Sequence, residues 1–164
     1  MCQPCLKDSV VAMDINITQQ TPLLATLKCP NLEYLDLTNG SDISDYAASF
    51  LYNHKDSLKK LAVNMNNIPV LPKDEIGVAP QLENITIYGP RSVYVTDEKF
   101  EPFLSYAQCA KVLDFGNAGS GVPASNIHLP NLKRFHSPLR MSTSYIPFLE
   151  RHSGTIETLV SGYM

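Results

Sequence analysis

One short pattern recurs along the chain at an interval of 50 residues. It starts with a proline and a side-chain amide and continues with the spacing apolar-x-x-apolar-x-apolar. The pattern occupies residues 30–37, 80–87 and 130–137, and Ser137 replaces the last apolar residue of the third copy. Apolar residues at alternate positions favour a short strand with one buried face, and regular recurrence is typical of proteins built from stacked repeats. The chain is therefore predicted to consist of stacked units.

A second set of segments with the same apolar spacing lies between these copies. It comprises residues 57–64, 109–115 and 155–161, and the stretch 7–16 aligns on 55–64 without a gap. The first apolar residues of the seven segments are Val10, Leu32, Leu58, Leu82, Ala110, Leu132 and Ile156. Successive members are separated by 22, 26, 24, 28, 22 and 24 residues, within the range of about 20–29 residues for a leucine-rich repeat.

The segments that connect the predicted strands are of two alternating kinds. Helices are predicted near 43–54, 97–108 and 144–152, because apolar residues three and four apart would share one helix face there. Looser, proline-containing segments such as 68–72 form the other connections. A Phe-Leu pair stands seven or eight residues before the next strand's first apolar residue in each helical connection, at 50–51, 103–104 and 148–149.

These units predict an α/β fold, namely a right-handed leucine-rich-repeat solenoid. About seven short parallel strands are expected near residues 10–16, 32–38, 58–64, 82–88, 110–116, 132–137 and 156–161. A single strand of this length cannot bury its apolar side, so stacking of neighbours has to supply the core. We expect one domain over residues 1–164, incomplete or uncapped at both ends, because neither terminal unit carries a visible polar cap.

The Pro-Asn-Leu-x-x-Leu-x-Leu segment at 30–37, the alternating helical connection and the irregular repeat length resemble the leucine-rich repeats of F-box proteins, particularly the divergent fungal kind. The resemblance covers nearly the whole chain. Ribonuclease-inhibitor-like repeats are also similar, but their strict Asn/Cys position and regular length are missing. The resemblance implies the substrate-recognition part of a ubiquitin ligase receptor. The F-box itself, a short N-terminal helical segment, has no counterpart in a sequence whose first predicted strand starts at Val10.

The residues between the buried ones are expected to line the concave side of the predicted sheet, because strand side chains alternate between two faces. Tyr34 and Tyr88 are candidate aromatic anchors and Arg134 is a candidate charged one, since tyrosine and arginine are favoured at binding hot spots. The predicted protein-binding residues are Tyr34, Asp36, Lys60, Asn84, Thr86, Tyr88, Asp114, Arg134 and His136. An ordinary solvated sheet face is the alternative interpretation.

Residues with recognisable site chemistry are sparse. The loop Gly116–Gly121 has the G-x-x-x-x-G spacing of a phosphate-binding loop, but Val122 and Pro123 stand where that motif has Lys and Ser or Thr. A nucleotide-binding enzyme is therefore a remote alternative. Cys2 and Cys5 form half of a zinc or redox motif without a second pair, and no Ser-His-Asp or Cys-His signature occurs. We expect no enzymatic activity, no catalytic residue, no metal and no cofactor.

Composition narrows the class of partner. The net charge is −3 and no cluster of Lys and Arg stands out, which argues against nucleic acid. The apolar stretches are too short for a membrane-spanning helix, and the first residues lack the pattern of a secretory signal. We therefore expect a cytoplasmic or nuclear location, with reduced thiols.

A non-catalytic protein–protein interaction module is the leading interpretation. The alternatives are a structural fragment of a longer repeat protein and self-association through uncapped ends.

Overall fold

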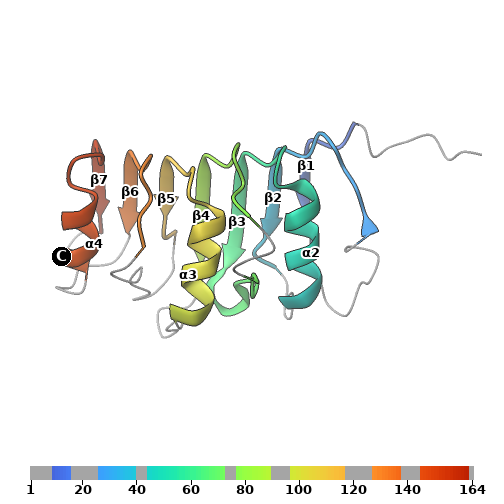
Figure 1. The fold of residues 1–164 in the computed structure, drawn as a ribbon, viewed down its shortest axis with the longest axis horizontal. Coiled ribbons are helices and arrows are strands. Elements are labelled where there is room, and N and C mark those ends of the chain that lie inside the picture. Colours follow the sequence, from blue (N-terminus) through green and yellow to red (C-terminus); the bar gives the residue numbers. More distant parts are fainter. Residues whose placement is uncertain are drawn as a thin grey trace, which may run out of the picture.

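Seven parallel strands form one sheet in which every strand lies beside its neighbours in the sequence. The structure is a computed structural model that describes residues 9–15, 26–39, 44–72, 77–89, 97–116, 127–137 and 145–162. The strands are β1 (Ala12–Asp14), β2 (Tyr34–Leu37), β3 (Lys60–Asn64), β4 (Asn84–Tyr88), β5 (Val112–Asp114), β6 (Arg134–Ser137) and β7 (Thr158–Ser161). Figure 1 shows them as successive arrows from β1 at one end of the molecule to β7 at the other.

Three α-helices are bounded in the described part of the chain: α2 (Ser44–His54), α3 (Asp97–Tyr106) and α4 (Ile146–Arg151). A short 3-10 helix, η2 (Met65–Asn67), follows β3. The three α-helices lie on the same side of the sheet (Figure 1). Their bounds agree within two residues with the helices predicted near 43–54, 97–108 and 144–152. The predicted α/β class, with seven parallel strands and three helices, is confirmed.

The strands pair in a single register across the whole sheet. Leu35 on β2 pairs with Met13 on β1 and with Leu61 on β3, and the row continues through the later strands. Its members are Met13, Leu35, Leu61, Ile85, Leu113, Phe135 and Leu159. The five central members are at most 1% exposed, whereas Leu159 on the outer strand is 51% exposed. The pairing inferred from the apolar spacing is confirmed.

Each strand starts two residues later than predicted, for example at Tyr34 instead of Leu32. The first apolar residue of the unit lies in the turn before the strand. Leu32 is fully buried, and its backbone N–H donates to Cys29 O at 3.0 Å. The next two N–H groups, of Glu33 and Tyr34, both donate to Val11 O of the preceding unit, at 2.8 and 3.0 Å. Pairing with β1 starts only there, so Leu32 belongs to the core but not to the sheet.

The core lies between the sheet and the helices. The helices contribute fully or almost fully buried side chains, namely Phe50, Leu51, Phe103, Leu104 and Phe148. They belong to the same apolar cluster as the central strand residues. The ring of Phe135 lies 5.9 Å from that of Phe115 and 5.3 Å from that of Phe148, measured between centroids. Helices of 6 to 11 residues are marginal in water when isolated, so this burial stabilises them.

Two buried histidines occupy equivalent positions at the ends of α2 and α4. His54 at the end of α2 donates Nδ1–H to Phe50 O at 2.7 Å and accepts the N–H of Cys29 on Nε2 at 2.8 Å. His152, after α4, repeats the arrangement with a carbonyl four residues earlier at 2.7 Å and the N–H of Leu129 at 2.9 Å. Using both nitrogens in this way requires a neutral ring with its proton on Nδ1. We call each arrangement a histidine clamp, because it joins the end of a helix to the turn before the preceding strand.

In the central helical unit, a backbone carbonyl group joins the end of the helix to the turn before the preceding strand. Ala107 occupies the position of the two histidines, and the N–H of Ala79 donates to Tyr106 O at 2.9 Å. The Tyr106 hydroxyl donates to Leu51 O at 3.1 Å and so joins α3 to α2. Burial raises the pKa of Tyr106 well above the usual tyrosine value. The hydroxyl therefore keeps its proton at neutral pH and can donate this bond.

We expect the protein to lose stability as the pH falls below about 6.5. Burial lowers the pKa of His54 and of His152 below the usual histidine value. The unfolded chain therefore binds protons on these rings before the folded chain does. The stability that the clamps contribute is complete above the unfolded pKa and is lost as the pH falls through the lower, folded pKa. Urea unfolding between about pH 7.5 and 5.5 measures this slope, to which each clamp contributes at most about 1.4 kcal/mol per pH unit.

A double variant with His54→Gln and His152→Gln keeps an amide acceptor at both positions but cannot titrate. Its unfolding free energy should depend less on pH over the same range. Gln81→Asn, at an exposed residue of the turn before β4, is the control that touches neither clamp and should leave the slope unchanged. Equal slopes in the wild-type protein and the double variant would contradict the role of the clamps.

Candidate functional site

The side chains that alternate with the core residues along each strand point away from the helices. We call this side of the sheet, opposite the helices in Figure 1, the open face. In β2, Leu35 and Leu37 are buried, whereas Tyr34 is exposed and Asp36 is partly exposed. Register pairing places equivalent side chains of all seven strands in rows across this face. The first row is Ala12, Tyr34, Lys60, Asn84, Val112, Arg134 and Thr158. The second row is Asp14, Asp36, Ala62, Thr86, Asp114, His136 and Val160.

All the residues predicted to bind a protein lie on the open face, in the rows expected from the apolar spacing. Eight of them belong to the two rows, and Tyr88 pairs with Asn64 one step farther along the strands. Tyr34 and Tyr88 are 36% and 40% exposed, so both rings are accessible to a partner. Ala62 is only 4% exposed although it lies on the same face. The larger side chains around it therefore shield the centre of the rows.

Tyr34 is held by hydrogen bonds along its own strand. Its hydroxyl donates to Asp36 Oδ2 at 3.0 Å. Asp36 Oδ1 accepts from the backbone N–H and from the hydroxyl of Thr38, at 2.9 and 2.6 Å. Burial, the bond to Asp36 and the nearby Asp36, Tyr88 and Asp14 raise the pKa of Tyr34 to about 12. The ring is therefore neutral and already ordered, which reduces the entropy that a partner would have to remove on binding.

Tyr88 lies over Gly116, which follows β5. A Cβ atom at position 116 would lie 2.7 Å from both Cδ1 and Cε1 of the Tyr88 ring. Such a contact is too short for any other residue, so glycine allows the close approach of the ring. Gly116 also opens the predicted loop Gly116–Gly121, whose remaining residues lie outside the described residues. In the described part, Gly116 therefore has a packing role.

Asp114 and His136 form a hydrogen-bonded pair across β5 and β6. Asp114 Oδ1 lies 2.7 Å from His136 Nδ1, and both side chains are partly exposed. Because an ionised carboxylate can only accept, Nδ1 donates this hydrogen bond, and no described residue bonds to Nε2. The other register partner of His136 is Val160, which has no nucleophilic atom. The pair therefore suits hydrogen bonding to a partner better than the nucleophile activation of a catalytic triad.

A row of charged residues that the repeat pattern alone did not predict runs along the edge where the strands begin. Its ion pairs are Lys59–Glu33 at 2.7 Å, Lys111–Glu83 at 2.6 Å and Lys133–Glu157 at 2.7 Å. Lys111, and more weakly Lys59, hold the pKa of Glu83 below its usual value. We call this the charge row. Its signal in the sequence was the recurrence of Lys or Glu directly after the first apolar residue of each unit from Leu32 onward. Lys111 and Lys133 belong to successive units, so the alternation of charge breaks between β5 and β6.

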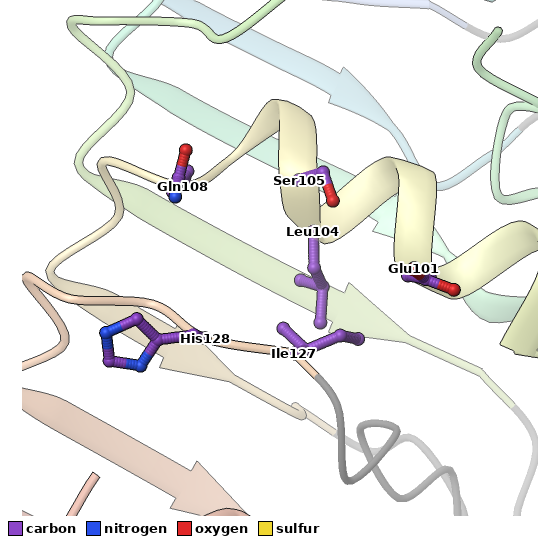
Figure 2. A pocket seen from close by; sticks show the side chains of 6 residues that line it. All are labelled: Glu101, Leu104, Ser105, Gln108, Ile127 and His128. Carbon is purple, nitrogen blue, oxygen red and sulfur yellow. The ribbon is translucent and has the colours of Figure 1, made fainter. Parts of the chain in front are cut away.

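A half-open pocket lies on the helix side of the molecule, between α3 and residues 127–128 (Figure 2). It is lined by Glu101, Leu104, Ser105, Gln108, Ile127 and His128. Figure 2 shows Leu104 and Ile127 pointing toward each other at its floor. Its volume of about 230 Å³ is below the range of about 300–1,000 Å³ typical of ligand pockets. The ring of His128 stacks on that of His152, with centroids 5.5 Å apart, so it packs against a histidine clamp.

The described residues contain no group of three or more His, Cys, Asp or Glu side chains able to hold a metal ion. The candidate thiol pair Cys2 and Cys5 lies outside them. Over the same described ranges, no helix combines the length and the apolar composition that crossing a membrane requires. The predicted binding residues gather on the open face, in the two rows and at Tyr88.

Substitution Gly116→Ala should displace the Tyr88 ring, because the added methyl group would occupy the space of two ring carbons. We expect changed ring-proton chemical shifts of Tyr88 in NMR spectra. The free energy of unfolding should fall by less than about 1 kcal/mol, since an exposed ring can move aside. Gly154→Ala is the matched control, because no atom lies within 4 Å of its added Cβ. Unchanged Tyr88 shifts in Gly116→Ala would contradict this placement of the ring.

Comparison with known proteins adds no further constraint. No family model, no curated protein and no solved structure matches the chain. A function for this protein therefore has to be argued from its own residues and their geometry.

Proposed function

We propose that the protein is a non-catalytic protein–protein interaction module whose partner binds on the open face. Among the described residues, the helices lie on the opposite side of the sheet (Figure 1), and the open face carries side chains of all seven strands in register. Its first row contains Tyr34 and Arg134, and tyrosine and arginine are enriched at protein interfaces. An enzymatic role has less support, since the register partner of His136 on its other side is Val160, and the hydroxyl-bearing Thr86 adjoins Asp114 rather than the histidine.

The observation that carries the proposal is that the rings of Tyr34 and Tyr88 are both exposed and held in place. Both rings are more than one-third exposed, yet one is hydrogen-bonded to Asp36 and the other rests on Gly116. Tyrosine is enriched at binding hot spots, and a ring that is ordered before binding loses little entropy in the complex. Two such rings on one face favour a docking surface over an ordinary solvated sheet.

The architecture that we propose for this surface is a right-handed leucine-rich-repeat solenoid. The recurrence of one strand every 22 to 28 residues and the sequential order of parallel strands support it. Solenoids of this kind present extended concave surfaces to protein partners. The resemblance of the segment at 30–37 to the repeats of F-box proteins supports a finer proposal, in which the module recognises the substrate of a ubiquitin ligase.

Loss of both rings should weaken partner binding strongly if this proposal is right. We expect the double variant with Tyr34→Ala and Tyr88→Ala to bind its partner at least tenfold more weakly, because single hot-spot residues contribute about 2 kcal/mol or more. The measurement is capture of cross-linked partners by the intact protein, identified by mass spectrometry, followed by titration of the captured protein. Tyr52→Ala, at a 50% exposed tyrosine of α2, is the matched control and should bind normally. Equal capture by the double variant and the wild-type protein would contradict the proposal.

Self-association is a second candidate, supported by Leu159. This residue continues the central core row on β7, but it is 51% exposed because no strand covers its outer side in the described residues. Backbone groups of an outer strand that face away from the sheet are free to pair with another chain. A second copy of the protein could therefore extend the sheet at β7 and cover this side chain.

Substitution Leu159→Lys should then lower the molar mass measured by sedimentation equilibrium at high protein concentration, since a charge would have to be buried in the contact. Ile146→Lys provides the control, because Ile146 is similarly exposed, at 47%, but lies on α4. A wild-type protein that stays monomeric over the whole concentration range would rule out this second candidate.

A further inference from the structure

The pocket on the helix side of the molecule is polar at both ends and apolar in the middle. Leu104 and Ile127 are buried and form its floor. Figure 2 shows Glu101 at one end of the pocket and Gln108 and His128 at the other, with the two apolar side chains between them. An occupant that matches these surroundings has a hydrocarbon middle and a polar group at each end.

The equivalent place in the preceding helical unit is occupied by a lysine of the protein itself. The Phe-Leu pairs of α2 and α3 align the two helices, so Lys55 has the position of Gln108. Gly77 has the position of Ile127, three residues before the proline of the recurring segment. Lys55 Nζ lies 4.8 Å from the centroid of the Tyr52 ring, and 3.5 Å from the point where a Cβ atom of Gly77 would lie. A long basic side chain therefore lies between α2 and the segment before β4.

The pocket of the later unit is open because its residues are shorter. Tyr52 and Lys55 of the earlier unit correspond to Ser105 and Gln108. The later unit also gains a negative charge, since Glu101 stands where α2 has an alanine. Of the six described residues that line the pocket, none is lysine or arginine and Glu101 is the one carboxylate. The lining thus lacks the basic side chain of the earlier unit and provides a partner for one.

The two ends of the pocket differ in electrostatic character. The His128 ring stacks on that of His152, with centroids 5.5 Å apart. Burial lowers the pKa of His152, and the nearby His128 and Arg151 lower it further. The positive Arg151 is therefore close to this end, whereas Glu101 lies at the opposite end. A cation is favoured beside Glu101, and a neutral polar group is favoured beside His128.

We propose that this pocket receives a long basic side chain, lysine or arginine, of a partner protein. The hydrocarbon stem lies on Leu104 and Ile127, as the stems of these residues commonly do on apolar surface. The cation faces Glu101, and the backbone amide groups of the same residue face Gln108 and His128. Glu101 already interacts within the protein, but a carboxylate has about four lone-pair sites and can accept more than one donor.

The size of the pocket favours one side chain over a small molecule. Its volume of about 230 Å³ is less than a drug-sized ligand requires. The pocket lies on the side of the sheet opposite the open face (Figure 1). The inference therefore goes beyond the proposed function and does not depend on it.

The test is a titration of the intact protein with single amino acids whose termini are blocked by acetyl and methylamide groups. Binding is followed in NMR spectra by the amide shift of Ile127 and the ring-proton shifts of His128. A ligand of this size should bind with a Kd in the millimolar range. We expect saturable shifts with blocked lysine or blocked arginine, which become smaller as salt screens the charges. Blocked norleucine and blocked citrulline, which keep a stem but carry no charge, should produce no such shifts.

Two variants separate recognition by the pocket from binding elsewhere. The double variant with Ser105→Tyr and Gln108→Lys copies the pair found on α2, so it should fold normally, fill the pocket and abolish the shifts. Glu101→Gln should weaken binding about two- to fivefold, because it removes the charge that attracts the cation. Glu150→Gln, at an exposed carboxylate of α4 outside the pocket, is the control and should bind as the wild-type protein does.

The inference would be overturned if neither basic amino acid shifted these signals, if blocked norleucine bound as tightly as blocked lysine, or if Glu101→Gln or the filled variant bound normally. Equal affinity for n-butylammonium, which lacks the amide groups, would assign the pocket to a free alkyl cation and overturn the assignment to a partner protein. The double variant at Tyr34 and Tyr88 should bind the blocked amino acids normally, so failure of the proposed function is detected separately.

Discussion

A strand of three to five residues can bury its apolar side chains only when another strand lies on each side of it. Every structural feature described above depends on this constraint. The central side chains of the row through Leu35 and Leu113 are buried because strands on both sides cover them. Leu159 lies on the outer strand and is exposed. The helices are held by the same core, since none of them is long enough to be stable alone. Because side chains alternate along a strand, burial of one set places the other set on the open face.

The pairing of the strands could be predicted from the sequence because apolar spacing and pairing have the same physical origin. A shift of one residue would turn Leu35 toward water and Tyr34 toward the helices, so only one alignment of the units buries the apolar residues.

The first residues of the strands were predicted less accurately. Leu32 is as apolar as Leu35, and only the hydrogen bonds of the turn before β2 distinguish it. The histidine clamps were missed because His54 bonds to a backbone N–H 25 residues away. The recurrence of Phe-Leu-x-x-His at 50–54 and 148–152 was their signal.

The open face illustrates how far such reasoning extends toward function. Which residues lie on this face follows from the alternation of side chains along each strand. The features that make the face suitable for binding depend on side-chain geometry. The hydrogen bond that orders Tyr34 needs an acceptor two residues later on the same strand, and the position of Tyr88 needs a glycine 28 residues later. Neither requirement changes the apolar pattern. The first contact depends on side-chain rotamers within one strand, and the second arises only when the units of β4 and β5 are stacked.

The broken alternation of the charge row makes the molecule respond to dissolved ions in two opposite ways. Between β2 and β5, and again between β6 and β7, neighbouring members of the row attract each other, so added electrolyte weakens these junctions. Lys111 and Lys133 meet at the junction of β5 and β6, where the same electrolyte relieves a repulsion. Concentrated salt thus weakens the junctions from β2 to β5 and from β6 to β7 while it strengthens the junction of β5 and β6, and the overall stability reflects only the difference between the two effects.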